Sequence, residues 1–147
     1  SQKPFADDLV QRCAWVTALQ ETPAETLEDI CNQRPGDDPR GWIELADLLR
    51  RQHRELAGDG LNFADVANCE MLDSLPRERR RWEILHEIQR RYLDTLEELS
   101  LWDRQTARLV AIELNECHRS GTTSANRRNG CSPSEWAIAA RIRNAGP

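Results

Sequence analysis

The sequence predicts an all-α fold, a compact orthogonal helical domain of about six to seven helices. A hydrophobic content of 39% and a charged content of 31% are typical of a globular protein. Valine is scarce and aromatic residues make up only 5%, which disfavours a sheet-rich fold. Apolar residues recur at steps of three and four between helix-start and helix-stop signals. A chain of 147 residues is long enough to bury one core without metal or disulfide cross-links.

The first helix is predicted from an apolar stripe near the beginning of the chain. The stripe consists of Phe5, Leu9, Cys13, Val16 and Leu19. All five side chains are expected to face the core.

A second, short helix is predicted to run to about residue 32. Thr22 stands where a capping residue is expected, Pro23 follows at the first helical position, and Glu25 completes a capping box. Residues 34–38, with Pro35 and Gly36, then break the helix.

Asp38 and Pro39 predict the start of a third helix, which is expected to stop at residues 58–60 (Gly-Asp-Gly), where a glycine supplies a left-handed end. Its core stripe is expected to be Trp42, Leu45, Ala46, Leu49, His53 and Leu56. Asn62 is expected to cap a fourth helix, from Phe63 to about Leu72.

The long fifth helix is predicted to begin at Pro76, and Asp103 is expected to cap the sixth. The inward face of the fifth helix reads Trp82, Leu85, Ile88, Tyr92, Leu96 and Leu99. That of the sixth reads Ala107, Val110, Ala111, Leu114 and Cys117. These helices complete a predicted helical domain over residues 1–118.

The last part of the chain has a different character. Residues 119–131 are rich in Ser, Thr, Asn, Gly and Arg and are predicted to be a flexible linker. Ser132 and Glu135 form a capping box, which predicts a C-terminal helix over residues 132–147. Its apolar stripe is narrow, so the sequence leaves open whether this helix packs on the domain.

The charge distribution argues against tight, autonomous binding of nucleic acid. The net charge is −5, and Lys3 is the only lysine among 20 basic residues. Residues 1–75 have a net charge of −8 and residues 76–147 of +3. The basic second part leaves room for a weak phosphate contact.

The five cysteines are odd in number and widely spaced, which predicts free thiols in a reducing compartment. We expect Cys13 and Cys117 to be small core residues. Because the sequence contains neither an 18-residue apolar run nor a recognisable signal peptide, a cytoplasmic protein without membrane contact is expected. The initial Ser1, in place of Met, suggests a piece of a longer protein.

The sequence offers no catalytic constellation, so we expect a domain that is not an enzyme and has no cofactor or metal. Phosphate-binding Gly-rich loops, His-Glu-x-x-His and Gly-x-Ser-x-Gly are all missing from the sequence. His53 and His118 are expected to stand alone, and His86 is expected on a solvated face. The paired carboxylates are predicted to be helix caps or solvated charges, because neighbours on a helix diverge by about 100°.

A run of arginines at the start of the fifth helix is the one candidate for a ligand contact. Arg77, Arg79, Arg80 and Arg81 place four guanidinium groups within five positions, and such groups bind phosphates. Acidic neighbours such as Asp73 offer a purely structural alternative. We take the four arginines as candidate DNA-contact residues.

About residues 38–117 resemble an AddB-type, inactivated superfamily I helicase, specifically the helical 1B-like subdomain of this helicase-nuclease subunit. The resemblance lies in stretches 42–49 (WIELADLL), 53–57 (HRELA), 60–67 (GLNFADVA), 81–85 (RWEIL), 92–93 (YL) and 101–108 (LWDRQTAR). It contains no catalytic signature, and the residues after 118 depart from it.

The resemblance implies a non-catalytic scaffold domain of a helicase-nuclease-like DNA repair protein, with weak DNA contact. Its partners would be the remainder of a larger parent chain or a helicase-nuclease partner subunit. The alternative is a free-standing helical protein–protein interaction module with tryptophan anchors. The sequence does not give the partner or the oligomeric state.

Overall fold

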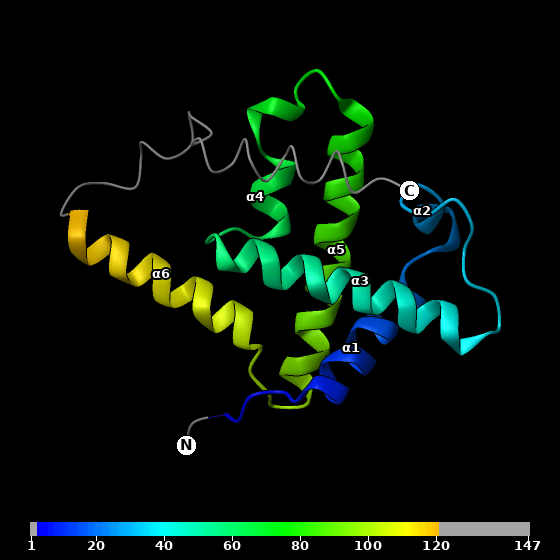
Figure 1. Cartoon of the computed structure of the whole chain (residues 1–147), viewed down its shortest axis with the longest axis horizontal. Helices are drawn as coiled ribbons and strands as arrows, with labels where there is room; N and C mark the ends of the chain where they lie inside the picture. Colours follow the sequence, from blue (N-terminus) through cyan, green and yellow to red (C-terminus); the bar gives the residue numbers. More distant parts are fainter. Residues whose placement is uncertain (1–2, 121–147) are drawn as a thin grey trace.

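The computed structural model describes residues 3–120, with side chains up to residue 115, and confirms the all-α prediction (Figure 1). The predicted linker at 119–131 and the predicted helix at 132–147 lie outside the described residues, apart from residues 119 and 120. The elements are α1 (Asp8–Glu21), α2 (Ala24–Glu28), α3 (Pro39–Gly58), α4 (Phe63–Ala67), the 3-10 helix η1 (Glu70–Leu72), α5 (Pro76–Glu98) and α6 (Arg104–Ser120).

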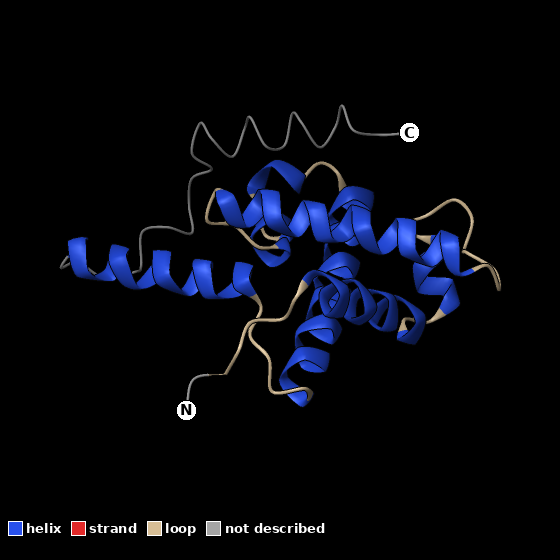
Figure 2. Ribbon diagram, turned by 60° about the horizontal axis from the view of Figure 1, so that its bottom comes forward, coloured by secondary structure: helices blue, strands red, loops and turns tan. Residues whose placement is uncertain are grey.

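The helices are arranged around a steep crossing of α3 and α5, which Figures 1 and 2 both show. Helix α1 packs against both of them, and α4 packs against α5. Helix α6 contacts α3 and otherwise extends away from the other helices. This arrangement agrees with the predicted orthogonal domain.

Trp15 stands at the centre of the core, although the predicted stripe of α1 omits it. Its ring stacks on Tyr92 with centroids 4.2 Å apart and an interplanar angle of 7°. Helix α1 buries Ala14, Trp15, Ala18 and Leu19. The prediction was wrong for three members of its stripe, which are exposed: Phe5, Leu9 and Cys13. The two small alanines let α1 pack closely and turn the large indole inward, and the predicted stripe did not count them.

The predicted capping box of α2 is also wrong. The Thr22 hydroxyl is buried and donates a hydrogen bond to the Ala18 carbonyl, 2.8 Å away, at the end of α1. It therefore does not cap α2, which follows Pro23 without a side-chain cap and ends at Glu28.

The predicted boundaries of α3 are confirmed. Asp38 accepts a hydrogen bond from the Arg40 backbone N–H at 3.0 Å, and Pro39 is the first helical residue. Gly60 has a φ of +76°, the left-handed conformation that ends the helix. Of the predicted stripe all but Leu45 are fully buried, and Leu45 packs partly buried against the core.

Asn62 and Asp65 cap α4 reciprocally. The helix stops at Ala67 rather than near Leu72, and the 3-10 helix η1 follows. Helix α5 begins at Pro76 and buries its predicted face except Leu99, which is 56% exposed. Leu99 lies just past the end of α5, where Ser100 at a φ of 56° turns the chain toward α6.

Over residues 3–120, none of the helices has an apolar stretch of the length needed to cross a membrane. The expectation of free thiols holds for Cys13 and Cys31 but is wrong for Cys69, which takes part in a disulfide bond. Cys13 is exposed rather than a core residue.

Candidate interaction surface

Helix α6 presents an apolar face to solvent. Val110 is 44% exposed and Leu114 is 57% exposed, although both were predicted to face the core. Ala107, one turn earlier, is half-buried on the same side. We call Ala107, Val110 and Leu114 the α6 face.

The opposite side of α6 rests on the domain. Leu109 and Ile112 are half-buried there, and the Ile112 side chain lies 3.7 Å from the position that a Cβ at Gly60 would take. Both sides of α6 therefore carry apolar residues at helical spacing. The sequence pattern alone does not distinguish the two sides, and the predicted inward face is the outer one.

Two aromatic rings lie exposed at the beginning of α6. The Trp102 backbone N–H donates to the Pro4 carbonyl at 2.8 Å, and the Ala6 N–H donates to the Trp102 carbonyl at 2.9 Å. These bonds join the N-terminal segment to the α5–α6 connection. The Phe5 side chain is 51% exposed and the Trp102 side chain 43%. We call this pair the aromatic corner. The Arg104 guanidinium lies over the Phe5 ring, 5.6 Å from its centroid.

A buried polar network anchors α6 to the core through Asp103. One carboxylate oxygen accepts from the Tyr92 hydroxyl at 2.6 Å, and the other contacts His53 Nε2 at 2.9 Å. The second oxygen also accepts from the Thr106 backbone N–H at 2.6 Å, so that Asp103 caps α6 as predicted. Gln89 Nε2 lies 3.0 Å from His53 Nδ1. All four polar side chains are buried, and His53, which was expected to stand alone, is in the middle of the network.

The network sets the ionisation of two of its members. Burial by itself raises the pKa of Asp103, but hydrogen bonds from His53, Tyr92 and the Thr106 N–H outweigh it and lower the pKa to about 2. Burial and the adjacent Asp103 carboxylate raise the pKa of Tyr92 well above its ordinary value of 10. Asp103 is therefore an anion and Tyr92 a neutral donor at neutral pH. The network is closed to solvent and joins the start of α6 to α3 and α5.

All four predicted DNA-contact arginines lie in the first two turns of α5, and their side chains have different surroundings. Arg79 donates to Asp73 at 2.5 Å and to the Cys69 carbonyl at 3.2 Å, which is the structural alternative recognised in the sequence. Arg80 lies 4.0 Å from an Asp29 carboxylate oxygen. Arg77 is exposed and Arg81 half-buried. Two of the four are thus next to carboxylates.

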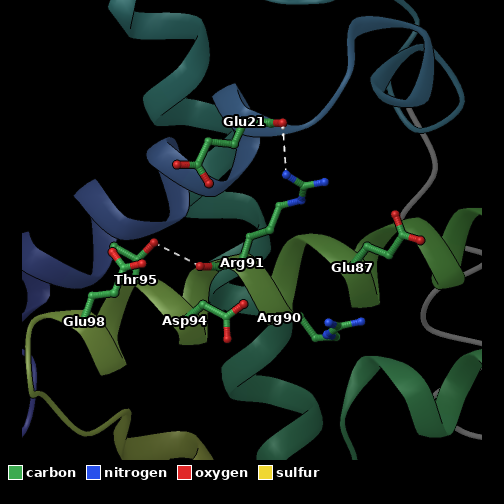
Figure 3. A pocket seen from close by; sticks show the side chains of 7 residues that line it. All are labelled: Glu21, Glu87, Arg90, Arg91, Asp94, Thr95 and Glu98. Atoms are coloured by element: carbon green, nitrogen blue, oxygen red, sulfur yellow. Dashed lines mark hydrogen bonds between the residues drawn. The ribbon is translucent and has the colours of Figure 1, made fainter.

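A shallow hollow of about 520 Å³ lies beside α5 and the end of α1 (Figure 3). Four acidic and two basic side chains line it, and the Arg91 guanidinium donates to the Glu21 backbone carbonyl at 3.1 Å. The lining residues are Glu21, Glu87, Arg90, Arg91, Asp94, Thr95 and Glu98. All seven are exposed or half-buried, so the hollow offers no shielded site for chemistry. In the part of the chain that the structure describes, no three His, Cys, Asp or Glu side chains are grouped to hold a metal ion.

Comparison with known proteins returned no matching family model, no matching curated protein and no matching solved structure.

Proposed function

We propose that this chain is a non-catalytic helical domain that acts as a scaffold and docks a protein partner through the α6 face and the aromatic corner. The observation that carries the proposal is the outward apolar side of α6. Val110 and Leu114 lie one helical turn apart on a helix that is anchored at its start by Asp103 and extends away from the other helices. A partner that covers these side chains would gain about 25 cal/mol for each Å² of apolar surface that it removes from water.

The aromatic corner extends the same docking surface at the beginning of α6. Exposed aromatic residues often contribute most of the binding energy at protein interfaces. Of the tryptophans that the structure places, Trp15, Trp42 and Trp82 are core residues, and Trp102 alone is exposed. The role of partner anchor, which the sequence assigned to tryptophans in general, therefore belongs to Trp102 among these.

The proposal suits either of the two settings expected from the sequence. In a helicase-nuclease-like DNA repair protein, the docking partner would be the remainder of the parent chain or a partner subunit. In a free-standing interaction module, it would be a separate protein. A weak DNA contact through the arginines at the start of α5 stays a prediction. Arg77 and Arg80 are both exposed, and Arg77 is the better placed because Arg80 lies next to the Asp29 carboxylate.

Site-specific photo-cross-linking tests the proposal. A benzophenone amino acid at Leu114 in the full chain, irradiated in its native cells, should give one defined adduct with a protein. The same group at Glu83, an exposed position on α5, is the matched control and should give none. Equal yields at the two positions, or no adduct at Leu114, would contradict a docking role for α6.

A further inference from the structure

The α6 face lies between two opposite charges. Successive residues of an α-helix are rotated by about 100°, so the Arg104 side chain projects from one flank of the stripe and Glu113 from the other. Both residues are exposed. They lie nine positions apart, which corresponds to about 13.5 Å along the helix axis. The face therefore carries a basic end and an acidic end.

The spacing of the apolar stripe specifies the shape of its complement. Steps of three and four residues, from Ala107 to Val110 and from Val110 to Leu114, are those of a seam between two packed helices. Such a seam takes the knobs of a second helix into the holes of the first. A strand or an irregular loop would match this spacing less well.

A second copy of this chain is a poor complement. Antiparallel pairing of two α6 helices, with Val110 of one beside Leu114 of the other, places residue 112 on the two-fold axis. Glu113 would then lie next to the same residue of the copy on the same flank. Two like charges in direct opposition are destabilising, and the pair would lack a compensating base.

We infer that the α6 face binds an amphipathic helix of a different sequence, with a carboxylate opposite Arg104 and a basic side chain opposite Glu113. The inference rests on the proposed docking function and adds the chemical class of the partner. An apolar seam supplies the affinity, and the two flanking charges select the partner and its direction. The aromatic corner, beside Arg104, contacts the end of the partner helix that carries the carboxylate.

Three stapled helical peptides with the same leucine seam test the inference. One carries Glu and Lys nine residues apart on its flanks, one carries Glu at both positions, and one carries Lys at both. At low salt, the Glu/Lys peptide should bind the full chain about fivefold more tightly than either of the others, measured by fluorescence anisotropy. With Glu113→Lys, the Glu/Glu peptide should become the tightest. Glu83→Lys is the matched control and should leave the order unchanged.

The outcomes separate the inference from the proposed function. If all three peptides bind equally and Leu114→Asp abolishes their binding, the face docks helices without charge selection and the inference falls. If none binds while the photo-cross-link at Leu114 forms, the inference falls and the docking function stands. If neither binding nor cross-link is found, both fall. A concentration-dependent dimer in sedimentation, lost in Leu114→Asp, would overturn the inference in favour of self-association.

Discussion

Asp103 is the residue on which the position of α6 depends. A single carboxylate caps α6, accepts a hydrogen bond from the Tyr92 hydroxyl and contacts His53, so it links α6 to both α5 and α3. The sequence predicted the cap, because Asp before a helical stripe is a local signal. It could not predict the contacts to His53 and Tyr92, since those depend on how α3 and α5 cross. A polar residue in an apolar stripe, as His53 is, was the one signal that a buried partner existed.

Removing the Tyr92 hydroxyl should destabilise the domain. Tyr92→Phe keeps the ring stacked on Trp15 but leaves one Asp103 oxygen without its donor inside the core. The expected loss is about 1–3 kcal/mol in the free energy of unfolding, measured by urea denaturation. Trp102→Phe, at an exposed aromatic residue, should change stability by less than about 0.5 kcal/mol. Equal effects of the two substitutions would show that the Tyr92–Asp103 hydrogen bond does not contribute to the free energy of unfolding.

The lowered pKa of Asp103 should also make the free energy of unfolding decrease at acidic pH. Its folded-state pKa is about 2, below the ordinary value of 3.8. The carboxylate therefore contributes stability that is present above about pH 4 and is lost as the pH falls through 2. The gap in unfolding free energy between wild type and Asp103→Asn should narrow over this range, as followed by circular dichroism. A gap that stays constant from pH 5 to pH 2 would contradict the lowered pKa of Asp103.

At the scale of elements, local signals predicted the starts of α3, α4, α5 and α6 but not that of α2, and the predicted faces were wrong for α1 and α6. The caps of α3, α4 and α6 follow from the side chains next to them. The orientations of α1 and α6 follow from contacts with other helices. In α6, apolar residues occur on both sides, so the stripe alone does not tell which side meets α3. In α1, the pair of alanines that permits close packing was not counted as a core signal.

The connection between α3 and α4 depends on Gly60. Its φ of +76° is costly for any residue with a Cβ, and Ile112 of α6 packs next to it. Gly60→Ala should lower the free energy of unfolding by about 1–2 kcal/mol in thermal or urea denaturation. Gly36→Ala is the control, because nothing lies within 4 Å of its Cβ position and its φ is not positive. If the two variants are equally stable, the left-handed end is not required.

The arginines at the start of α5 should differ in function, with Arg79 contributing to stability and Arg77 free to contact a ligand. Arg79 donates hydrogen bonds to Asp73 and to the Cys69 carbonyl. Arg79→Ala should therefore lower the free energy of unfolding by roughly 1 kcal/mol. Arg77→Ala, at an exposed side chain, should leave stability unchanged and weaken any DNA binding measured by anisotropy at low salt. A stability loss in Arg77→Ala as large as that in Arg79→Ala would contradict this division.

For the whole molecule, composition and periodicity were sufficient to predict the all-α class, but not which helices cross at the centre of the domain. The outward side of α6 could not be predicted, because it depends on where α3 ends and on how Asp103 is held. The candidate interaction surface thus comes from the packing of α6 and not from a motif. Of the arginines that the sequence analysis proposed for DNA contact, Arg79 makes hydrogen bonds within the domain.

The free energy of unfolding of two aspartate variants tests the orientation of α6 most directly. Leu114→Asp, on the outer side, should stay within about 0.5 kcal/mol of wild type, because its side chain remains in water. Ile112→Asp, on the inner side next to Gly60, should lose about 1–3 kcal/mol, because it places a carboxylate against the domain. The reverse order, with Leu114→Asp the more destabilised, would show that the exposed face of α6 is in fact its core face.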